Sequence, residues 1–346
     1  MIAKRIWFNK TFSNVSSWIQ LLRDNPNGQK FHIICSHTQE RFSGFQFSDE
    51  AFVEDSSLEE NAYLNFCLDF CQKNKVDIFV PNREIILISK HKNLFTNIGV
   101  KLLISATSDN LELINNKKLL YNSLDSNIVL IPDFKVINNY ESFKFAYSEL
   151  RKKHNTLCLK PSVGVFARGF KIIRENSNKL ENLLNGSFYS IDLQDLEMIF
   201  ENNENFEELL LMEYLEDYEY SVDCLGFKGK LLRSIARRKP HLKGEYGQYL
   251  EFNPQIQAIA DRITEFFELE GIYNIQLKCQ KDKIKLLEIN TRMSGGLNMS
   301  ALSGINFVYW AIKNLIDNNS NINLIPQPIT DIWVNEVGQA VSLKAF

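Results

Sequence analysis

The sequence predicts a mixed fold in which an α/β region comes first and α+β regions follow. Strand-like and helix-like segments alternate through residues 1–106, which is typical of a small parallel sheet with helical crossovers. After that, paired strand-like runs alternate with amphipathic helices, and a hairpin within 274–298 carries polar residues along one face. Because 346 residues exceed one typical core, we expect two or three domains.

Composition excludes several classes of partner. The hydrophobic content of 45% and charged content of 23% are ordinary for a soluble globular protein. A net charge of −3 gives no electrostatic case for binding nucleic acid or an anionic membrane. No apolar run reaches membrane-spanning length, and the first ten residues are too charged for a signal peptide. We therefore expect a cytoplasmic protein that binds neither nucleic acid nor membrane.

Two common chemistries find no support in the sequence. The six cysteines lie in apolar segments without metal-ligand spacing, so we expect reduced core thiols. The five histidines are isolated, and no Ser-His-Asp or Cys-His arrangement is predicted. The turn after the first strand, at 10–13, lacks the glycine fingerprint of dinucleotide-binding proteins, which argues against a dehydrogenase.

The N-terminal region is expected to alternate between strands and helices. We expect strands at 5–9, 31–35, 77–81 and 100–104, and helices at 15–22, 62–73 and 84–95. Arg83 follows the third strand, where it would either contact a substrate or lie in solvent. The apolar pattern breaks at 106–110, which predicts a domain boundary and the start of a helix that ends near residue 124.

The rest of the chain is expected to be richer in hairpins. We expect strands at 157–161, 171–173, 208–215, 219–226 and 332–343, helices at 254–269 and 300–316, and a mobile loop at 244–248. Residues 176–208 are polar around two amphipathic helical segments, and no chemistry can be named for them.

The hairpin within 274–298 presents oxygen ligands on one strand face. Glu288 and Asn290 point the same way because side chains alternate along a strand. A three-residue loop centred on Asp282 would place Gln276 opposite Glu288, whereas a two-residue loop would place it opposite Leu287. One carboxylate with two amide oxygens suits Mg²⁺ that is also bound to nucleotide phosphates. The alternative is a hairpin with one wet face.

A lysine inside an apolar strand indicates an anion site. Lys160 lies in the strand 157–161, and burying its ammonium group without a partner would cost several kcal/mol. Gly164 and Gly169 lie in the loop 162–169, where backbone N–H groups would close over phosphate oxygens. A plain hairpin is the alternative interpretation.

These motifs resemble the ATP-grasp superfamily, in particular carboxylate-amine ligases and carbamoyl-phosphate-synthase-like ATP-binding domains. The resemblance implies two α+β subdomains that clamp ATP, preceded by a small parallel-sheet Rossmann-like domain. On this basis residues 1–106 form the N-terminal domain and 107–346 the ATP-grasp domain. Within the latter, 127–212 would be the small subdomain over the nucleotide and 213–346 the metal-binding subdomain.

The resemblance also implies roles for basic residues. Lys117 would reach the nucleotide phosphates, although the family's preceding Asp is Asn116 here and Lys118 is an alternative. Arg237 and Arg292 would act as catalytic cations at the transferred phosphate, and the amides of 294–296 would steady the anionic intermediate.

The same resemblance implies which residues contact the adenine base and the ribose of the nucleotide. The backbone of Glu213, Tyr214 and Leu215 would bind the adenine edge, and Glu219 would accept the ribose hydroxyls. The implied cofactors are ATP and Mg²⁺, with Mn²⁺ as a substitute, and Gln276 joins Glu288 and Asn290 as metal ligands.

The implied reaction is phosphorylation of a carboxylate by ATP and attack of an amine on the acyl phosphate, with release of ADP and phosphate. The partners would be a small carboxylate and a small amine, and a homodimer is left open. Two alternatives remain: an enzyme that phosphorylates bicarbonate or a carboxylate as carbamoyl-phosphate synthase does, and an ATP-binding regulator without turnover.

Overall fold

The computed structural model describes residues 3–343 apart from positions 13, 165–167, 176–177, 179, 181–182, 185–188, 243 and 339. The chain divides into two compact units. The first unit contains Met1–Glu112, Tyr218–Gln276 and Ile289–Phe346, and the second contains Leu113–Asp217 and Leu277–Glu288. The domain limits expected from the sequence stay a prediction.

The N-terminal part of the first unit is the expected parallel sheet, in the order β3-β2-β1-β4-β5. Its strands are β1 (Lys4–Phe8), β2 (Phe31–His37), β3 (Glu50–Val53), β4 (Ile78–Val80) and β5 (Lys101–Leu102). The strand β3 was not expected from the sequence. The order reverses between β1 and β4, and ligands of parallel sheets bind at the carboxyl ends of strands at such a point.

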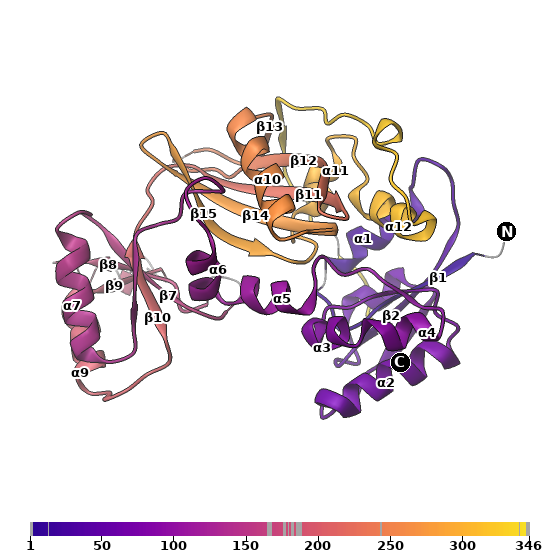
Figure 1. The fold of residues 1–346 in the computed structure, drawn as a ribbon, viewed down its shortest axis with the longest axis horizontal. Helices are drawn as coiled ribbons and strands as arrows, with labels where there is room; N and C mark the ends of the chain where they lie inside the picture. The colour runs from indigo at the N-terminus through magenta and orange to yellow at the C-terminus, as the bar shows by residue number, and fades with distance from the viewer. Residues whose placement is uncertain are drawn as a thin grey trace. The chain divides into compact units, whose positions relative to one another are not determined.

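Helices connect these strands as the alternating pattern predicts. They are α1 (Val15–Arg23), α2 (Glu60–Lys73), α3 (Ile85–Lys90) and α4 (Lys92–Asn97) (Figure 1). The single helix expected at 84–95 is thus two helices. The backbone at His91 has φ −107°, outside the helical range, and the chain turns there.

The second sheet has the order β15-β14-β11-β12-β13-β16. Its strands are β11 (Glu219–Phe227), β12 (Lys230–Arg238), β13 (Gln248–Glu251), β14 (Gly271–Gln280), β15 (Lys283–Asn290) and β16 (Ile332–Val334). The chain passes between the two units along β14 and β15. Gln248, placed in the expected mobile loop, begins β13, which pairs with both β12 and β16.

Three helices accompany this sheet: α10 (Pro254–Phe266), α11 (Leu297–Ala301) and α12 (Phe307–Asp317). The helix expected at 300–316 is interrupted at Gly304, whose φ of +87° is a left-handed conformation that ends a helix. Within the first unit, one core joins side chains of both sheets, for example Ile6 and Trp18 with Leu225 and Phe307. Burial of this shared core holds the N-terminal sheet to the larger one.

The second unit has its own sheet, in the order β6-β10-β7-β8-β9. Its strands are β6 (Phe134–Ile137), β7 (Leu157–Pro161), β8 (Lys171–Arg174), β9 (Ser190–Asp192) and β10 (Leu209–Glu213). The helices α7 (Tyr140–Arg151) and α9 (Leu193–Glu201) cover the sheet and pack Phe143 and Phe200 into a separate core (Figure 1).

The turn between β14 and β15 has two residues, 281–282, with φ of 47° and 63°. Positive φ at both positions is typical of a type I′ hairpin, so the expected three-residue loop is wrong. Buried positions alternate along β15 as far as Leu286 and then resume at Ile289, three residues later. The alternation of buried and exposed residues is therefore out of step by one residue after Leu286. The length of the loop alone does not determine which residue lies opposite Gln276. Its pairing with Glu288 stays a prediction.

The helix expected up to residue 124 is also divided, into α5 (Ser108–Asn115) and α6 (Lys117–Ser123). Asn116 between them is extended, and its side chain accepts a hydrogen bond from the N–H of Leu119. Asn116 therefore caps α6 and places Lys117 at the first helical position.

We expect Asn116→Ala to lower the free energy of unfolding by about 1 kcal/mol, because the N–H of Leu119 loses its acceptor. Asn116→Asp should retain the stability, because a carboxylate caps a helix equally well. Urea denaturation of the two variants checks this. Equal stability of Asn116→Ala and the parent protein would show that the cap has no energetic role.

Candidate nucleotide and substrate sites

Two lysine ammonium groups face one carboxylate in the second unit. Nζ of Lys160, on β7, lies 3.1 Å from Oε2 of Glu288, and Nζ of Lys117 lies 3.8 Å from the same oxygen. The side chains of Lys117, Lys160 and Glu288 are only 6%, 16% and 20% exposed. These three groups together carry a net positive charge in a poorly hydrated place, which favours the binding of an anion.

Lys117 rather than Lys118 reaches this cluster. The Lys117 ammonium group also donates a hydrogen bond of 3.0 Å to the carbonyl of Gly164. Burial and the nearby Lys160 ammonium group lower the pKa of Lys117 below its ordinary range. Lys118 instead pairs with Glu208 at 2.6 Å. The carboxylate of Glu208 satisfies Lys118, so the alternative assignment has no geometric support.

The loop predicted to cover the phosphates starts beside Lys117. The N–H of Lys117 donates to the carbonyl of Ser162 at 2.8 Å, which holds the start of the loop against α6. Gly169 has φ +74°, and a Cβ there would lie 2.7 Å from Cγ of Pro161, so only glycine fits. Residues 165–167 of this loop lie outside the described residues, and the phosphate-binding roles of Gly164 and Gly169 stay predictions.

Glu213, predicted at the adenine edge, turns its side chain into the second unit. Its carboxylate accepts a hydrogen bond of 2.9 Å from the N–H of Asp133 and pairs with Lys285. Nδ1 of His154 lies 3.3 Å from its second oxygen. These contacts fix the end of β10, and any adenine contact of Glu213 must therefore come from its backbone, as the resemblance implies.

The next two residues leave one backbone donor for a ligand. The N–H of Tyr214 donates to the carbonyl of Thr156 at 3.0 Å, and the Lys278 ammonium group lies 5.0 Å from the centre of the Tyr214 ring. Within the described residues, the N–H of Leu215 makes no hydrogen bond. The binding of the adenine edge by this segment stays a prediction.

The predicted metal ligands come from both units. Glu288 belongs to the second unit, whereas Gln276 and Asn290 belong to the first. Among the described residues, no three His, Cys, Asp or Glu side chains form a group that could hold a metal ion. The predicted set of one carboxylate and two amide oxygens is not of that kind. This assignment stays a prediction.

Arg292 and Asn290 lie together in the first unit. Nη2 of Arg292 donates to Oδ1 of Asn290 at 3.4 Å, and Nη1 donates to the carbonyl of Met293 at 3.2 Å. The guanidinium carbon lies 5.5 Å from the centre of the Phe12 ring, in the turn after β1. A guanidinium over an aromatic face is attracted by the ring's negative surface, so Phe12 helps to orient Arg292.

Arg237, predicted as a second catalytic cation, is almost completely buried, and all three of its nitrogens donate within the first unit. The acceptors are Asp223 at 3.0 Å, Ser221 at 3.0 Å, Ser294 at 3.1 Å, Ser300 at 2.8 Å and the amide oxygen of Gln248. A Cβ on Gly296 would lie 2.4 Å from Nη1 of Arg237. The guanidinium thus packs against the 294–296 turn, and a role as a catalytic cation stays a prediction.

Glu219, predicted to bind the ribose, begins β11 and forms an ion pair with Lys239. Two of these ion pairs were not expected from the sequence, namely Glu219 with Lys239 and Arg237 with Asp223. The signal for Asp223 was present, because Glu219, Ser221 and Asp223 alternate as polar residues along one strand. One polar strand face therefore supplies both acidic partners.

Arg83 does not lie free in solvent. It binds Glu54 at 3.3 Å and stacks over the Tyr63 ring at 4.1 Å. The buried Glu54 carboxylate also accepts hydrogen bonds of 2.9 Å from the N–H of Lys10 and from the hydroxyl of Tyr63. Arg83 therefore ties together the loops at the carboxyl ends of β1, β3 and β4.

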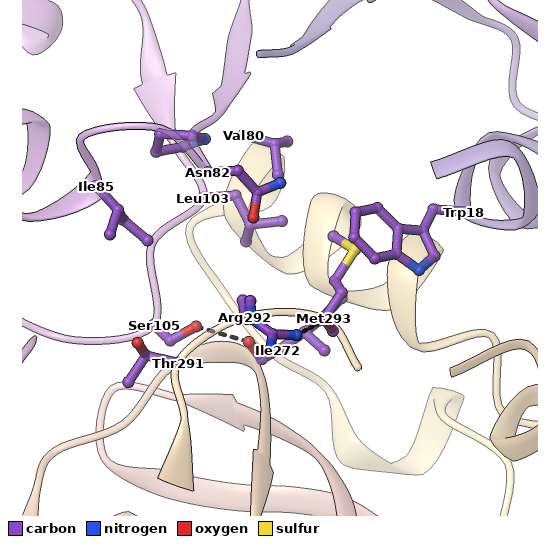
Figure 2. A pocket seen from close by; sticks show the side chains of 11 residues that line it. Trp18, Val80, Asn82, Ile85, Leu103, Ser105, Ile272, Thr291, Arg292 and Met293 are labelled. Carbon is purple, nitrogen blue, oxygen red and sulfur yellow. Dashed lines mark hydrogen bonds between the residues drawn. The ribbon is translucent and has the colours of Figure 1, made fainter. Parts of the chain in front are cut away.

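A small cavity lies near the carboxyl ends of β4 and β5. Figure 2 shows the side chains that surround it, which come from α1, from the ends of β4 and β5, and from the segment after β15. Arg292 and Met293 contribute from that last segment, and Trp18 contributes from α1. The predicted catalytic Arg292 thus lies beside the carboxyl ends of β4 and β5.

A small parallel sheet followed by one further sheet in the first unit and one in the second is the ATP-grasp arrangement that the resemblance implied. Residues 205–340 match a family model described as "ATP-grasp in the biosynthetic pathway with Ter operon". No curated protein matches the sequence.

Solved structures show the same fold over most of the chain. The ADP complex of an N5-carboxyaminoimidazole ribonucleotide synthetase matches with TM-score 0.66 and 13% identity, over 96% of this chain and 80% of that one. An L-amino acid ligase from Bacillus licheniformis matches with TM-score 0.61 and 12% identity, over 94% and 75% of the two chains.

A third structure is the biotin carboxylase domain of Hydrogenobacter thermophilus 2-oxoglutarate carboxylase, in complex with MgADP, ADP and bicarbonate. It matches with TM-score 0.63 and 14% identity, over 92% of this chain and 71% of that one. The ATP-grasp fold is thereby confirmed, and the family model over residues 205–340 agrees with the resemblance. In the described part of the chain, no helix is long and apolar enough to cross a membrane.

We expect Arg237→Ala to lower the free energy of unfolding by about 3–5 kcal/mol, because it leaves the Asp223 carboxylate buried and unpaired. The neighbouring Arg238→Ala is the matched control and should cost about 1 kcal/mol or less, because Arg238 is 25% exposed. Guanidinium denaturation measures both. A loss of activity in Arg237→Ala without a loss of stability would instead favour direct contact with substrate.

Proposed function

We propose that this protein is an ATP-dependent ligase that phosphorylates a carboxylate to an acyl phosphate and joins it to an amine, releasing ADP and phosphate. The second unit would bind the nucleotide through Lys117, Lys160 and the 213–215 backbone. The first unit would hold the acyl group through Arg292. The solved structures with this fold include an L-amino acid ligase and a biotin carboxylase domain, which supports this class of reaction.

The arrangement of Lys117, Lys160 and Glu288 is the observation that carries the proposal. A structural ion pair needs one cation for each carboxylate, whereas here two ammonium groups lie within 3.8 Å of one oxygen. The second cation is costly to bury unless an anion accompanies it. The phosphates of ATP would provide that anion. The same cluster would then stabilise charge on the phosphates that remain with the nucleotide.

Carboxylate and amide oxygens are chemically suited to a magnesium ion that is bound partly by phosphate. Such ions take one or two carboxylates and complete their octahedron with phosphate oxygens and water. Glu288 would provide the carboxylate, and Gln276 and Asn290 the amide oxygens. Bound Mg²⁺ or Mn²⁺ would neutralise phosphate charge during transfer.

The basic groups also suggest which phosphorus is attacked. Lys117 and Lys160 would hold the phosphates that stay with ADP, and the loop from Ser162 would cover the α-phosphate. Arg292, beside the cavity of the first unit, would orient the carboxylate towards the γ-phosphate. The amine would then displace phosphate from the acyl phosphate, forming the C–N bond. AMP formation is not expected.

We expect Lys160→Ala to weaken ATP binding at least tenfold, because it removes one cation from the phosphate site. Lys118→Ala is the matched control, since Lys118 lies one position from Lys117 but pairs with Glu208. Its affinity should stay within about twofold of the parent. Titration calorimetry with MgATP distinguishes them. Equal affinities in all three proteins would make Lys160 structural.

We expect Glu288→Ala to abolish ATP turnover while circular dichroism stays unchanged, because the proposed metal loses its carboxylate ligand. Activity is measured with carboxylates and hydroxylamine, which attacks an acyl phosphate to give a hydroxamate and free phosphate. Chromatography should show ADP in equal amount to the hydroxamate. Stoichiometric AMP, or near-normal turnover in the variant, would contradict the proposed mechanism.

A further inference from the structure

The cavity in Figure 2 is lined by residues from several helices and strands. α1 contributes Trp18, the end of β4 contributes Val80, and α3 contributes Ile85. The segment after β15 contributes Arg292 and Met293. All of these residues belong to the first unit. The cavity is therefore a property of that unit alone.

The walls of this cavity are mainly apolar. Most of the wall is supplied by Trp18, Val80, Pro81, Ile85, Leu103, Ile272 and Met293, and Asn82 and Thr291 add polar side chains. Ser105 also lines the cavity, but its hydroxyl donates to the carbonyl of Ile272 at 2.6 Å, so its polar group is already satisfied. Among the described residues that line the cavity, Arg292 alone is charged. A ligand with one anionic group and one apolar group matches this lining.

The size of the cavity limits the apolar group. Its volume is about 20 Å³, little more than the space that one water molecule needs. A methyl or ethyl group fits such a space, whereas an aromatic or long aliphatic group does not. Against the apolar part of the wall, a hydroxyl would lose its hydrogen bonds to water, whereas an alkyl group has none to lose.

We infer that this cavity is the specificity pocket for the acid substrate, which is a small carboxylate with a methyl- to ethyl-sized apolar substituent. Arg292 binds the carboxylate at the rim, and the substituent lies among Trp18, Ile85 and Met293. This inference rests on the proposed function, because it assigns the acid that is phosphorylated. It adds the substrate class and the residues that select it.

Ile85 allows the pocket to be enlarged without disturbing the core. It is only partly buried at the start of α3, and Ile86 beside it is also partly buried but does not line the cavity. Ile85→Ala would remove three carbons from the wall. Ile86→Ala removes the same atoms from a neighbouring position, so it controls for effects on the helix.

The test measures hydroxamate formation with MgATP, hydroxylamine and unbranched acids of two to six carbons, with and without an α-amino group. We expect the parent to prefer a substituent of one or two carbons, with kcat/KM falling about tenfold for each further methylene. Ile85→Ala should move the preferred length up by one or two carbons. Ile86→Ala should keep the preference of the parent.

The outcomes separate this inference from the proposed function. If the parent forms hydroxamate but Ile85→Ala keeps the same preferred length, the specificity pocket is wrong and the ligase proposal stands. A parent preference for long or aromatic acids, or an equal shift in both variants, also overturns the pocket. If no acid yields ADP or hydroxamate, the proposed function itself fails.

Discussion

The proposed nucleotide site depends on an imbalance of charge around Glu288. Lys117 and Lys160 both approach its carboxylate, and neither is well hydrated. In the folded protein such an imbalance costs free energy, so a site of this kind is unfavourable unless its function is to bind an anion. Local structure contributes to this arrangement. Asn116 caps α6, so that Lys117 is the first residue of the helix and its side chain reaches the cluster.

The first unit contains a buried ion pair in which each charge is matched. Arg237 and Asp223 are buried together, and the surrounding hydroxyls of Ser221, Ser294 and Ser300 satisfy their remaining groups. A network of this kind is stable only when every member is present. Because Arg237 packs against the 294–296 turn, this network holds the turn in one conformation beside the proposed acid-binding residues.

Much of the fold followed from periodicity. The alternating N-terminal segments predicted a parallel sheet, and it is present, because apolar runs bounded by turns are strong local signals. Short elements were missed or merged: β3 was absent from the prediction, and helices were expected to run through His91 and Asn116. These breaks depend on single backbone conformations and on capping, which a pattern of apolar residues does not register.

The sequence by itself determined the order of the motifs, the apolar strand that carries Lys160 and the polar strand that carries Glu288. Only the tertiary structure decided which groups meet. It brought Lys117 rather than Lys118 to Glu288, buried Arg237 against Asp223, and made the turn after β14 two residues long. The reason is physical: strand parity and composition are local, whereas the pairing of charges depends on the packing of segments that lie far apart in the chain.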